Sequence, residues 1–309
     1  MWATIQTQIL AGLEGLKVGD MDFFQKILYL IAEYGPSYMR GAGNTLVIAL
    51  VSTIIGCLIG LGVGIVQTIP LSKKDSIFKK IVVYLCRGIM AVYVEVFRGT
   101  PMMVQAMFIY FGIPVVFGFF LPLWPTAFLV VSINTGAYMA ETVRGGILSI
   151  DPGQTEGAKA IGMNHVQTMM HIILPQTLRN IMPQIGNNLI INIKDTCVLS
   201  VISVSELFLA HTKVAGALYT FFESATITMV IYLTMTLVLS RLLRWMEKKM
   251  DGNDSYDLAT TDTLAHTTGL YSYPGKGSNF DERHTEQSQD SNPLEDDMPK
   301  KSKKKGREN

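Results

Sequence analysis

The stretch EGAKAIG at Glu156–Gly162, followed after nine residues by IILP at Ile172–Pro175, decides how this chain is organised. It is polar and rich in small residues, whereas the segments on both sides of it are long and apolar. A proline after a run of helix-forming residues is typical of a helix end. The pattern therefore predicts a short folded loop between two membrane spans, with a helical part that ends at Leu174–Pro175.

Small residues in this loop predict that it docks closely on another protein. Gly157, Ala158 and Gly162 give its helix little side-chain volume, so the helix can lie deep in a groove, with Glu156 available for an ion pair at the rim. The alternative is a helix packed only on its own protein, but a small, apolar face outside the membrane needs covering. We expect a docking surface made of Glu156, Gly157, Ala158, Gly162 and Pro175.

The rest of the chain has the composition of an integral membrane protein. Of its 309 residues 49% are apolar, and they are gathered into blocks rather than spread in amphipathic repeats. Asp, Glu, Lys and Arg are absent from Gly41–Ser72 and again from Gly99–Ala140. The first range can hold one spanning helix and the second most of two. We predict an all-α integral membrane fold.

The apolar blocks predict five transmembrane helices. These are Asn44 to about Ile65, an interrupted segment at Ile77–Phe119, about Trp124–Gly146, about Ile181–Leu209, and Thr226 to about Leu242. The first span carries small surfaces on which another helix can pack closely. They are provided by Gly56, Gly60, Gly62 and Gly64.

Basic residues give the expected orientation. They cluster after the first span, around the polar loop and after the fifth span, whereas residues 112–124 have none and residues 210–224 have only Lys213. Because basic loops stay on the cytoplasmic side, the N-terminus is expected outside and the C-terminus inside. The polar loop is then cytoplasmic.

Two terminal segments flank the expected spanning domain at 44–249. Residues 1–43 include an amphipathic run at Phe23–Ile31, which predicts an interfacial helix rather than a signal peptide. Residues 250–309 carry 12 acidic and 8 basic side chains with little apolar periodicity, which predicts a disordered acidic tail with a basic end at Lys300–Lys305. A solvated tail needs no nucleic-acid partner, and we expect none.

Two polar interruptions at membrane depth are candidate sites. At Glu95–Pro101 the proline removes a backbone donor and Gly99 loosens the chain, so backbone groups there can face a ligand. Lys194–Thr196 places charges near the middle of the fourth span, where each costs roughly 2.5–3.5 kcal/mol unless it pairs or meets water. The structural alternative is an ion pair of Asp195 with Lys194 or Arg98.

Four segments in this order resemble a known family. They are Tyr93–Gln105, Ile133–Gly146, the loop at Glu156–Pro175, and Asn192–Thr196. Together they are similar to the permease subunits of binding-protein-dependent ABC importers for polar amino acids, of the glutamine, histidine and arginine type. The resemblance covers about residues 36–249, and its one small departure is Gly157, where the family usually has alanine.

The resemblance implies a type I ABC importer permease of five helices in a prokaryotic plasma membrane, with a cytoplasmic coupling helix in the polar loop. It implies an ATP-binding cassette ATPase that docks on this loop, an extracytoplasmic amino-acid-binding protein, and a homodimer or a pair with a similar permease. The sequence lacks the phosphate-binding motif G-x-x-x-x-G-K-[ST], so ATP and Mg²⁺ belong to the partner and this chain binds no cofactor.

The resemblance also implies a midmembrane substrate site at the two interruptions. A zwitterion needs an acceptor for its ammonium group and donors for its carboxylate. Asp195 is the expected ammonium partner. The other candidates are Arg98, Thr100, Gln105, Thr196 and Asn188. Asn188, two helical turns before Asp195, favours a neutral polar substrate such as glutamine over a cationic one.

Two other classes of function were weighed against an importer subunit. An ion-coupled amino-acid carrier would explain the broken helices but leaves the polar loop without a partner. An intramembrane enzyme would need a second catalytic group near Asp195, and none has a convincing spacing. The three cysteines and the histidines at 165, 171 and 211 show no metal-ligand spacing.

Overall fold

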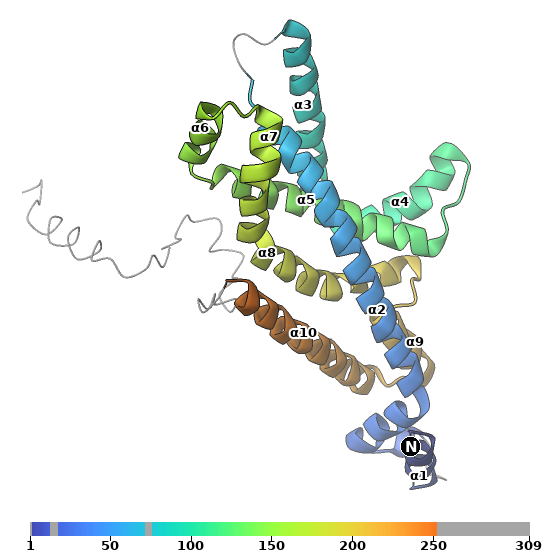
Figure 1. Ribbon diagram of the computed structural model, residues 1–309. Helices are drawn as coiled ribbons and strands as arrows, with labels where there is room; N and C mark the ends of the chain where they lie inside the picture. The colour runs from blue at the N-terminus through green and yellow to red at the C-terminus, as the bar shows by residue number, and fades with distance from the viewer. Residues whose placement is uncertain (1, 13–17, 72–75, 252–309) are drawn as a thin grey trace, which may run out of the picture. The chain divides into compact units, whose positions relative to one another are not determined.

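The computed structural model describes residues 2–12, 18–71 and 76–251, and this part of the chain is helical without strands. Figure 1 shows the helices α1 to α10 along the chain. The acidic tail, apart from its first two residues, and the basic run at Lys300–Lys305 lie outside the described residues.

The longest helix is α2, Phe23–Thr68, which spans 46 residues and about 70 Å at 1.5 Å per residue. It begins where the Gln25 side chain accepts a hydrogen bond from the Asp22 backbone N–H at 3.0 Å. It crosses residue 43, so the amphipathic run at Phe23–Ile31 and the first expected span belong to one helix. Its early part packs against later helices. For example, Lys26 forms an ion pair at 3.5 Å with Glu223, at the start of the last helix.

Glycines bring α2 against α5, Leu123–Leu148, along much of their length. A Cβ atom at Gly56 would lie 2.6 Å from Thr135, one at Gly60 2.4 Å from Met139, and one at Gly64 2.6 Å from Val143. The expected close approach is therefore confirmed at these three positions. Gly62 has open space beside it.

The interrupted segment consists of two helices, α3 at Ile77–Gly99 and α4 at Met102–Phe117, which meet at 111°. Helices α2 and α10, Phe221–Asp251, are long and apolar enough to cross a membrane, and the bent pair is a third candidate. The other long helices, α5 and α8 (Leu174–Asp195), are not among these candidates by length and apolar composition. The number of five spans stays a prediction.

The polar loop and the fourth expected span differ from expectation. Helix α6, Pro152–Ala160, is followed by α7, His165–Thr168, a π-turn at Met169–Ile173 and α8, Leu174–Asp195. The prediction that the helical part ends at Leu174–Pro175 was wrong, because a proline in the first turn of a helix removes no required donor.

Beyond α8 the chain does not continue as one helix. A 3₁₀-helix at Thr196–Ile202 and a turn with Ser203 at φ 66° lead into α9, Leu207–Leu218. Two short helices at the start of the chain, α1 at Trp2–Gly12 and a 3₁₀ turn at Val18–Asp20, complete the described elements.

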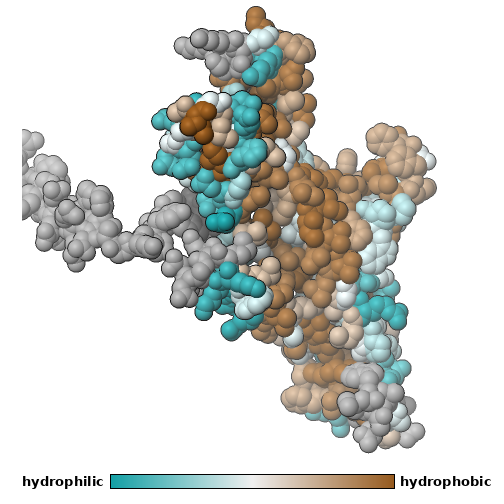
Figure 2. All heavy atoms as spheres, viewed as in Figure 1, coloured by the Kyte–Doolittle hydropathy of each residue, from teal (hydrophilic) through white to brown (hydrophobic). Residues whose placement is uncertain are grey.

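Apolar side chains cover much of the outer surface. Figure 2 shows hydrophobic residues along α2 and beside α4, with hydrophilic residues around α6 and α7. Large side chains are exposed on several helices, for example Leu58 on α2, Leu85 on α3 and Val238 on α10. Such surfaces are expected to face lipid or another membrane chain.

Candidate functional site

Helix α6 is fixed at both ends by backbone capping. Asp151 Oδ1 accepts a hydrogen bond from Gly153 N at 2.8 Å, and Pro152 stands in the first turn. At the other end Gly162 N donates to Lys159 O and Met163 N donates to Ala158 O, both at 3.0 Å. Gly162 has φ 84°, the left-handed conformation that this helix ending requires.

Two further elements support α6. Asn164 caps α7, since its Oδ1 accepts from Gln167 N at 2.9 Å. Ile150, Met169 and Ile173 form a buried apolar cluster beneath the loop. The loop is thus a folded surface.

The structure divides the residues predicted for docking. Glu156, Gly157, Gly162 and Pro175 are exposed, whereas Ala158 is only 2% exposed and faces the protein's own interior. Ala158 therefore supports the loop from below.

Three exposed apolar residues of the same loop were missed by the sequence analysis. Ile161, Val166 and Met170 are 78%, 67% and 54% exposed, and Figure 2 shows brown atoms within the hydrophilic region around α6 and α7. These residues come to one surface because of where the short helices α6 and α7 begin and end. The sequence did not indicate those bounds, so the three residues were not predicted. We call the exposed residues Glu156, Gly157, Ile161, Gly162, Val166 and Met170 the coupling surface, after the coupling helix that the sequence resemblance leads us to expect in this loop.

His165 lies beside this surface, and the pKa of its side chain is shifted. Partial burial, with the nearby charges of Lys159 and Lys79, lowers the pKa of its imidazole. The neutral form is therefore favoured near pH 7.

The break between α3 and α4 is held by Gln105, which is 7% exposed. Its Nε2 donates to Phe97 O at 3.0 Å and to Thr100 O and Oγ1 at 2.9 Å each, while its Oε1 accepts from Asn134 Nδ2 at 3.1 Å. Thr100 Oγ1 donates to Val96 O at 2.7 Å. The carbonyls that the break leaves without helical donors are thus bound by this chain's own side chains.

Asparagines on α8 bind the neighbouring helices. Asn192 Nδ2 donates to Thr53 Oγ1 at 2.7 Å and to Thr135 Oγ1 at 2.9 Å. Asn188 Nδ2 donates to Gln184 O at 3.1 Å and contacts the sulfur of Met139 at 3.3 Å. Asn192 was not singled out from the sequence, although its spacing of four residues from Asn188 puts both on one helix face.

Asp195 is exposed at the end of α8, unlike Asn188 on the turns before it. Among the described residues it makes no hydrogen bond and no ion pair within 4 Å. Thr196 is buried and donates to Ile193 O at 2.9 Å.

Arg98 does not pair with Asp195. Its guanidinium lies 3.8 Å from Glu141 and over the ring of Tyr138, both on α5. The structure therefore brings Thr100 and Gln105 together and places Arg98 with other residues. The alternative of an ion pair of Asp195 with Lys194 or Arg98 is not found among the ion pairs of the described residues.

A buried carboxylate at the start of α9 escaped the sequence analysis. Glu206 is 1% exposed, and it accepts from Phe208 N at 2.7 Å, Leu209 N at 2.6 Å and Tyr232 Oη at 3.1 Å. An acidic residue directly before an apolar run is a helix-start signal that could have revealed it.

His211 is likewise satisfied within the protein. Its Nδ1 lies 2.8 Å from Ser224 Oγ, which also bonds Tyr38 Oη at 2.5 Å. Within the described part of the chain, no group of three His, Cys, Asp or Glu side chains could hold a metal ion.

Comparisons with known proteins agree with this architecture. A family model described as "Binding-protein-dependent transport system inner membrane component" matches residues 83–252. The glutamine transport system permease protein GlnP of Escherichia coli K12 is 36% identical over 216 residues, which cover 70% of this chain and 93% of that protein. The arginine transport system permease protein ArtQ of Bacillus subtilis is 33% identical over 219 residues, with 71% and 94% covered.

Solved structures show the same fold. A chain of an amino acid ABC transporter crystallised with histidines matches with a TM-score of 0.63 and 33% identity, over 74% of this chain and 99% of that one. A chain of the inward-facing MetNI methionine ABC transporter matches with a TM-score of 0.52 and 19% identity, over 67% and 94%, which supports the fold alone. The chain therefore belongs to the inner membrane components of binding-protein-dependent transport systems, as a permease subunit of the type I importer fold that works with a separate ATPase.

Proposed function

We propose that this permease subunit translocates a polar amino acid, with glutamine as the first candidate, in an ATP-driven importer supplied by an extracytoplasmic binding protein. The permease of a glutamine system and that of an arginine system are similar over most of the spanning part. Asn188 favours glutamine between the two, because a cationic side chain would be better matched by a carboxylate at that position.

The observation that carries the ATP-driven mechanism is the coupling surface. A short helix with closed caps presents small residues beside exposed Ile161, Val166 and Met170. Exposed apolar groups beside small side chains fit a groove on a partner. The partner is the ATP-binding cassette ATPase, which holds ATP and Mg²⁺, and Glu156 supplies a charge at the rim. An ion-coupled carrier has no use for such a surface.

For the substrate we propose a contact at Asp195. This carboxylate is exposed where α8 ends, and no hydrogen bond or ion pair to another described residue is found for it. It would accept hydrogen bonds from the ammonium group of an amino acid. Thr196 and Asn188 lie at the end of α8 and on it, but both are buried and donate to carbonyls of their own helix. Gln105 and Thr100 bond each other at the α3–α4 break, and Arg98 pairs with Glu141.

The importer is proposed to act as a dimer of this permease or a pair with a similar one. One set of these helices leaves large apolar surfaces uncovered, and a shared axis along the pathway would bury part of them. ATP binding and hydrolysis by two ATPases would move the coupling surfaces together and apart and rock the two permeases between outward and inward states.

Co-purification in mild detergent tests the docking. We expect the tagged parent chain to retain its ATPase and the Ile161→Asp variant to lose it, because a charge would then be buried in the groove. The matched control is Phe24→Asp, which places the same charge at a side chain that is 71% exposed near the other end of α2. Equal retention of the ATPase by both variants would contradict the docking surface.

Uptake into proteoliposomes that contain the whole complex and its binding protein tests the substrate. We expect uptake of L-glutamine that requires internal ATP and is indifferent to a proton ionophore. The Asp195→Asn variant should lose uptake while keeping its ATPase. Uptake that follows the proton gradient without ATP would favour the ion-coupled carrier, and preference for L-arginine would refute the assignment to glutamine.

A further inference from the structure

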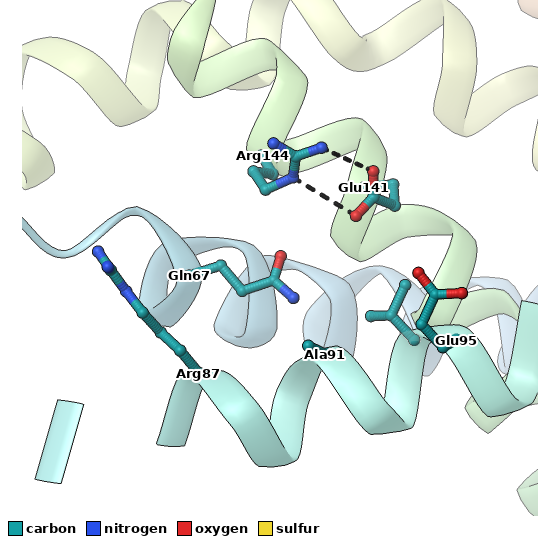
Figure 3. A pocket seen from close by; sticks show the side chains of 7 residues that line it. Gln67, Arg87, Ala91, Glu95, Glu141 and Arg144 are labelled. Carbon is teal, nitrogen blue, oxygen red and sulfur yellow. Dashed lines mark hydrogen bonds and ion pairs between the residues drawn. The ribbon is translucent and has the colours of Figure 1, made fainter. Parts of the chain in front are cut away.

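A second polar feature lies apart from α8, in an open pocket of about 270 Å³ between α2, α3 and α5. Its apolar wall is continuous with a buried cluster that contains Val63, Val94 and Ala140. Figure 3 shows the side chains of Gln67 from α2 and Glu95 from α3 reaching toward the space beside the Glu141–Arg144 pair on α5. Three helices thus bring polar groups to one small cavity.

The charges around the pocket are balanced. Arg87 and Arg144 are the cations, and Glu95 and Glu141 are the anions. Glu141 is engaged, since Arg144 Nη2 donates to it at 2.9 Å and Arg98 lies 3.8 Å away. Because the lining has no net charge, a ligand with one sign of charge gains little there, whereas a ligand carrying both signs can pair with each.

Two polar atoms of the lining, Gln67 Oε1 and Arg87 Nε, are buried without a hydrogen bond among the residues that the structure describes, although Arg87 Nη2 donates to Ile69 O. Glu95 beside them is exposed, and no hydrogen bond or ion pair to a described residue is found for it. Buried polar groups without partners are costly, and in native proteins they commonly mark a missing water, ion or ligand. Here they are one neutral acceptor and one cationic donor, beside the exposed carboxylate of Glu95.

We propose that this pocket binds a small zwitterion, with its ammonium group at Glu95 and Gln67 and its anionic oxygens at Arg144, whereas Arg87 points away from Glu95 (Figure 3) and donates to Ile69 O. The matching chemistry is that of a free α-amino acid or of a phosphatidylethanolamine headgroup. The volume suits a ligand of this size, because drug-sized ligands occupy pockets of about 300–1,000 Å³.

The pocket is separate from the substrate contact proposed at Asp195. Its lining comes from α2, α3 and α5, with no residue of α8. It lies near the ends of α2 and α5 that adjoin the polar loop, because α2 ends at Thr68 and α5 at Leu148, just before α6. A bound zwitterion would tie α3 to α5 beside the segment that carries the coupling surface.

Binding to the whole permease–ATPase complex tests the proposal. The complex is placed in nanodiscs of phosphatidylglycerol, which has no ammonium group, and carries Asp195→Asn to silence the other contact. Radiolabelled L-glutamine is the probe in equilibrium dialysis. We expect saturable binding that weakens about tenfold or more with Glu95→Gln or Gln67→Leu, since the first removes the charge that pairs with the ammonium group and the second removes an acceptor for it.

Glu33→Gln is the matched control, because it neutralises an exposed carboxylate near the other end of α2. Two competitors dissect the zwitterion. 4-Aminobutanamide lacks the carboxylate of glutamine and glutaramate lacks the ammonium group, and each should compete at least about tenfold more weakly than glutamine itself. Retention of the ATPase by every variant shows that it is folded.

The lipid source is distinguished by native mass spectrometry of the complex from membranes that contain phosphatidylethanolamine. If glutamine does not bind but the parent retains this lipid and Glu95→Gln loses it, the zwitterion is a lipid headgroup. If neither ligand depends on Glu95, the proposal is overturned. The amino-acid arm rests on the proposed function, and uptake by the complex with Asp195 intact tests that function separately. If this complex transports glutamine but the Asp195→Asn complex binds none, only the proposal for the pocket is refuted.

Discussion

Gly162 has a conformational role that the sequence analysis assigned to close approach instead. A Cβ atom added there would meet nothing within 4 Å, so space is not limiting inside the chain. Its φ of 84° is the limiting feature, because residues other than glycine adopt the left-handed region at a cost of roughly 1–2 kcal/mol. Gly157 also has open space but sits inside α6 with ordinary backbone.

We therefore expect Gly162→Ala to loosen the end of α6 and Gly157→Ala to leave it unchanged or slightly firmer. Gly162→Asn should fall between them, since asparagine tolerates the left-handed region. Amide hydrogen exchange of the Met163 N–H, which bonds Ala158 O, measures the effect. Equal exchange in all three variants would show that the backbone conformation at Gly162 carries no strain.

At this scale the sequence predicted which residues matter better than what they do. It singled out Gln105 and Thr100, yet these bond the carbonyls of the α3–α4 break rather than standing free for a ligand. It could not foresee this because the partner Asn134 is distant in sequence. It missed Glu206 and Asn192, whose partners also lie on other helices.

The α3–α4 break depends on Gln105. Substitution of this residue tests whether its side chain holds the break or contacts the substrate. Gln105→Leu removes every hydrogen bond of the side chain, and buried groups left unsatisfied cost about 1–3 kcal/mol each. We expect the angle between α3 and α4 to broaden, measured by spin-label distances across the break, with transport falling in parallel. Gln154→Leu, at an exposed glutamine of α6, is the control. Lost transport with an unchanged distance distribution would instead place Gln105 in contact with substrate.

Packing between α2 and α5 depends on glycines at one helix face. A side chain at Gly60 would collide with Met139 and the backbone of Ala140, whereas Gly62 faces open space on the same helix. Gly60→Leu should lower the free energy of unfolding by about 1–3 kcal/mol or prevent assembly, as overpacking does. Gly62→Leu makes the same change of residue type in the same helix, so its effect on helix propensity is the same, and it should behave like the parent. Thermal unfolding in detergent compares the two, and similar melting temperatures would refute the close packing.

At the scale of elements, periodicity located the helices but not their continuity. The glycine pattern and the break at Gly99–Pro101 were predictable because local residues cause both. The continuity of α2 through residue 43 was not, since its early part is stabilised by contacts with α9 and α10, far away in sequence. Pro175 was misread because a proline can begin a helix as well as end one.

The described helices, within residues 2–251, have a polar end and an opposite end joined by α2. Figure 1 shows α6, α7 and the start of α3 near one end of α2 and α1 near the other. Lys79 on α3 and Lys159 on α6 both lie near His165, so basic residues from two separate helices converge at the first end. The 46 residues of α2 amount to about 70 Å of helix, whereas a hydrocarbon core is only about 30 Å thick, so α2 is longer than a single span requires.

The convergence of basic residues predicts that the end with α6 is cytoplasmic and that the start of α2 is outside. Single cysteines test this after Cys57, Cys86 and Cys197, all free thiols, are replaced by serine. A membrane-impermeant maleimide should label the Phe24→Cys variant in intact cells and the Gln154→Cys variant only in inverted vesicles, because both side chains are exposed at opposite ends. The reverse pattern would put the coupling surface on the side without ATP, and the docking of an ATPase there would then be excluded together with the orientation.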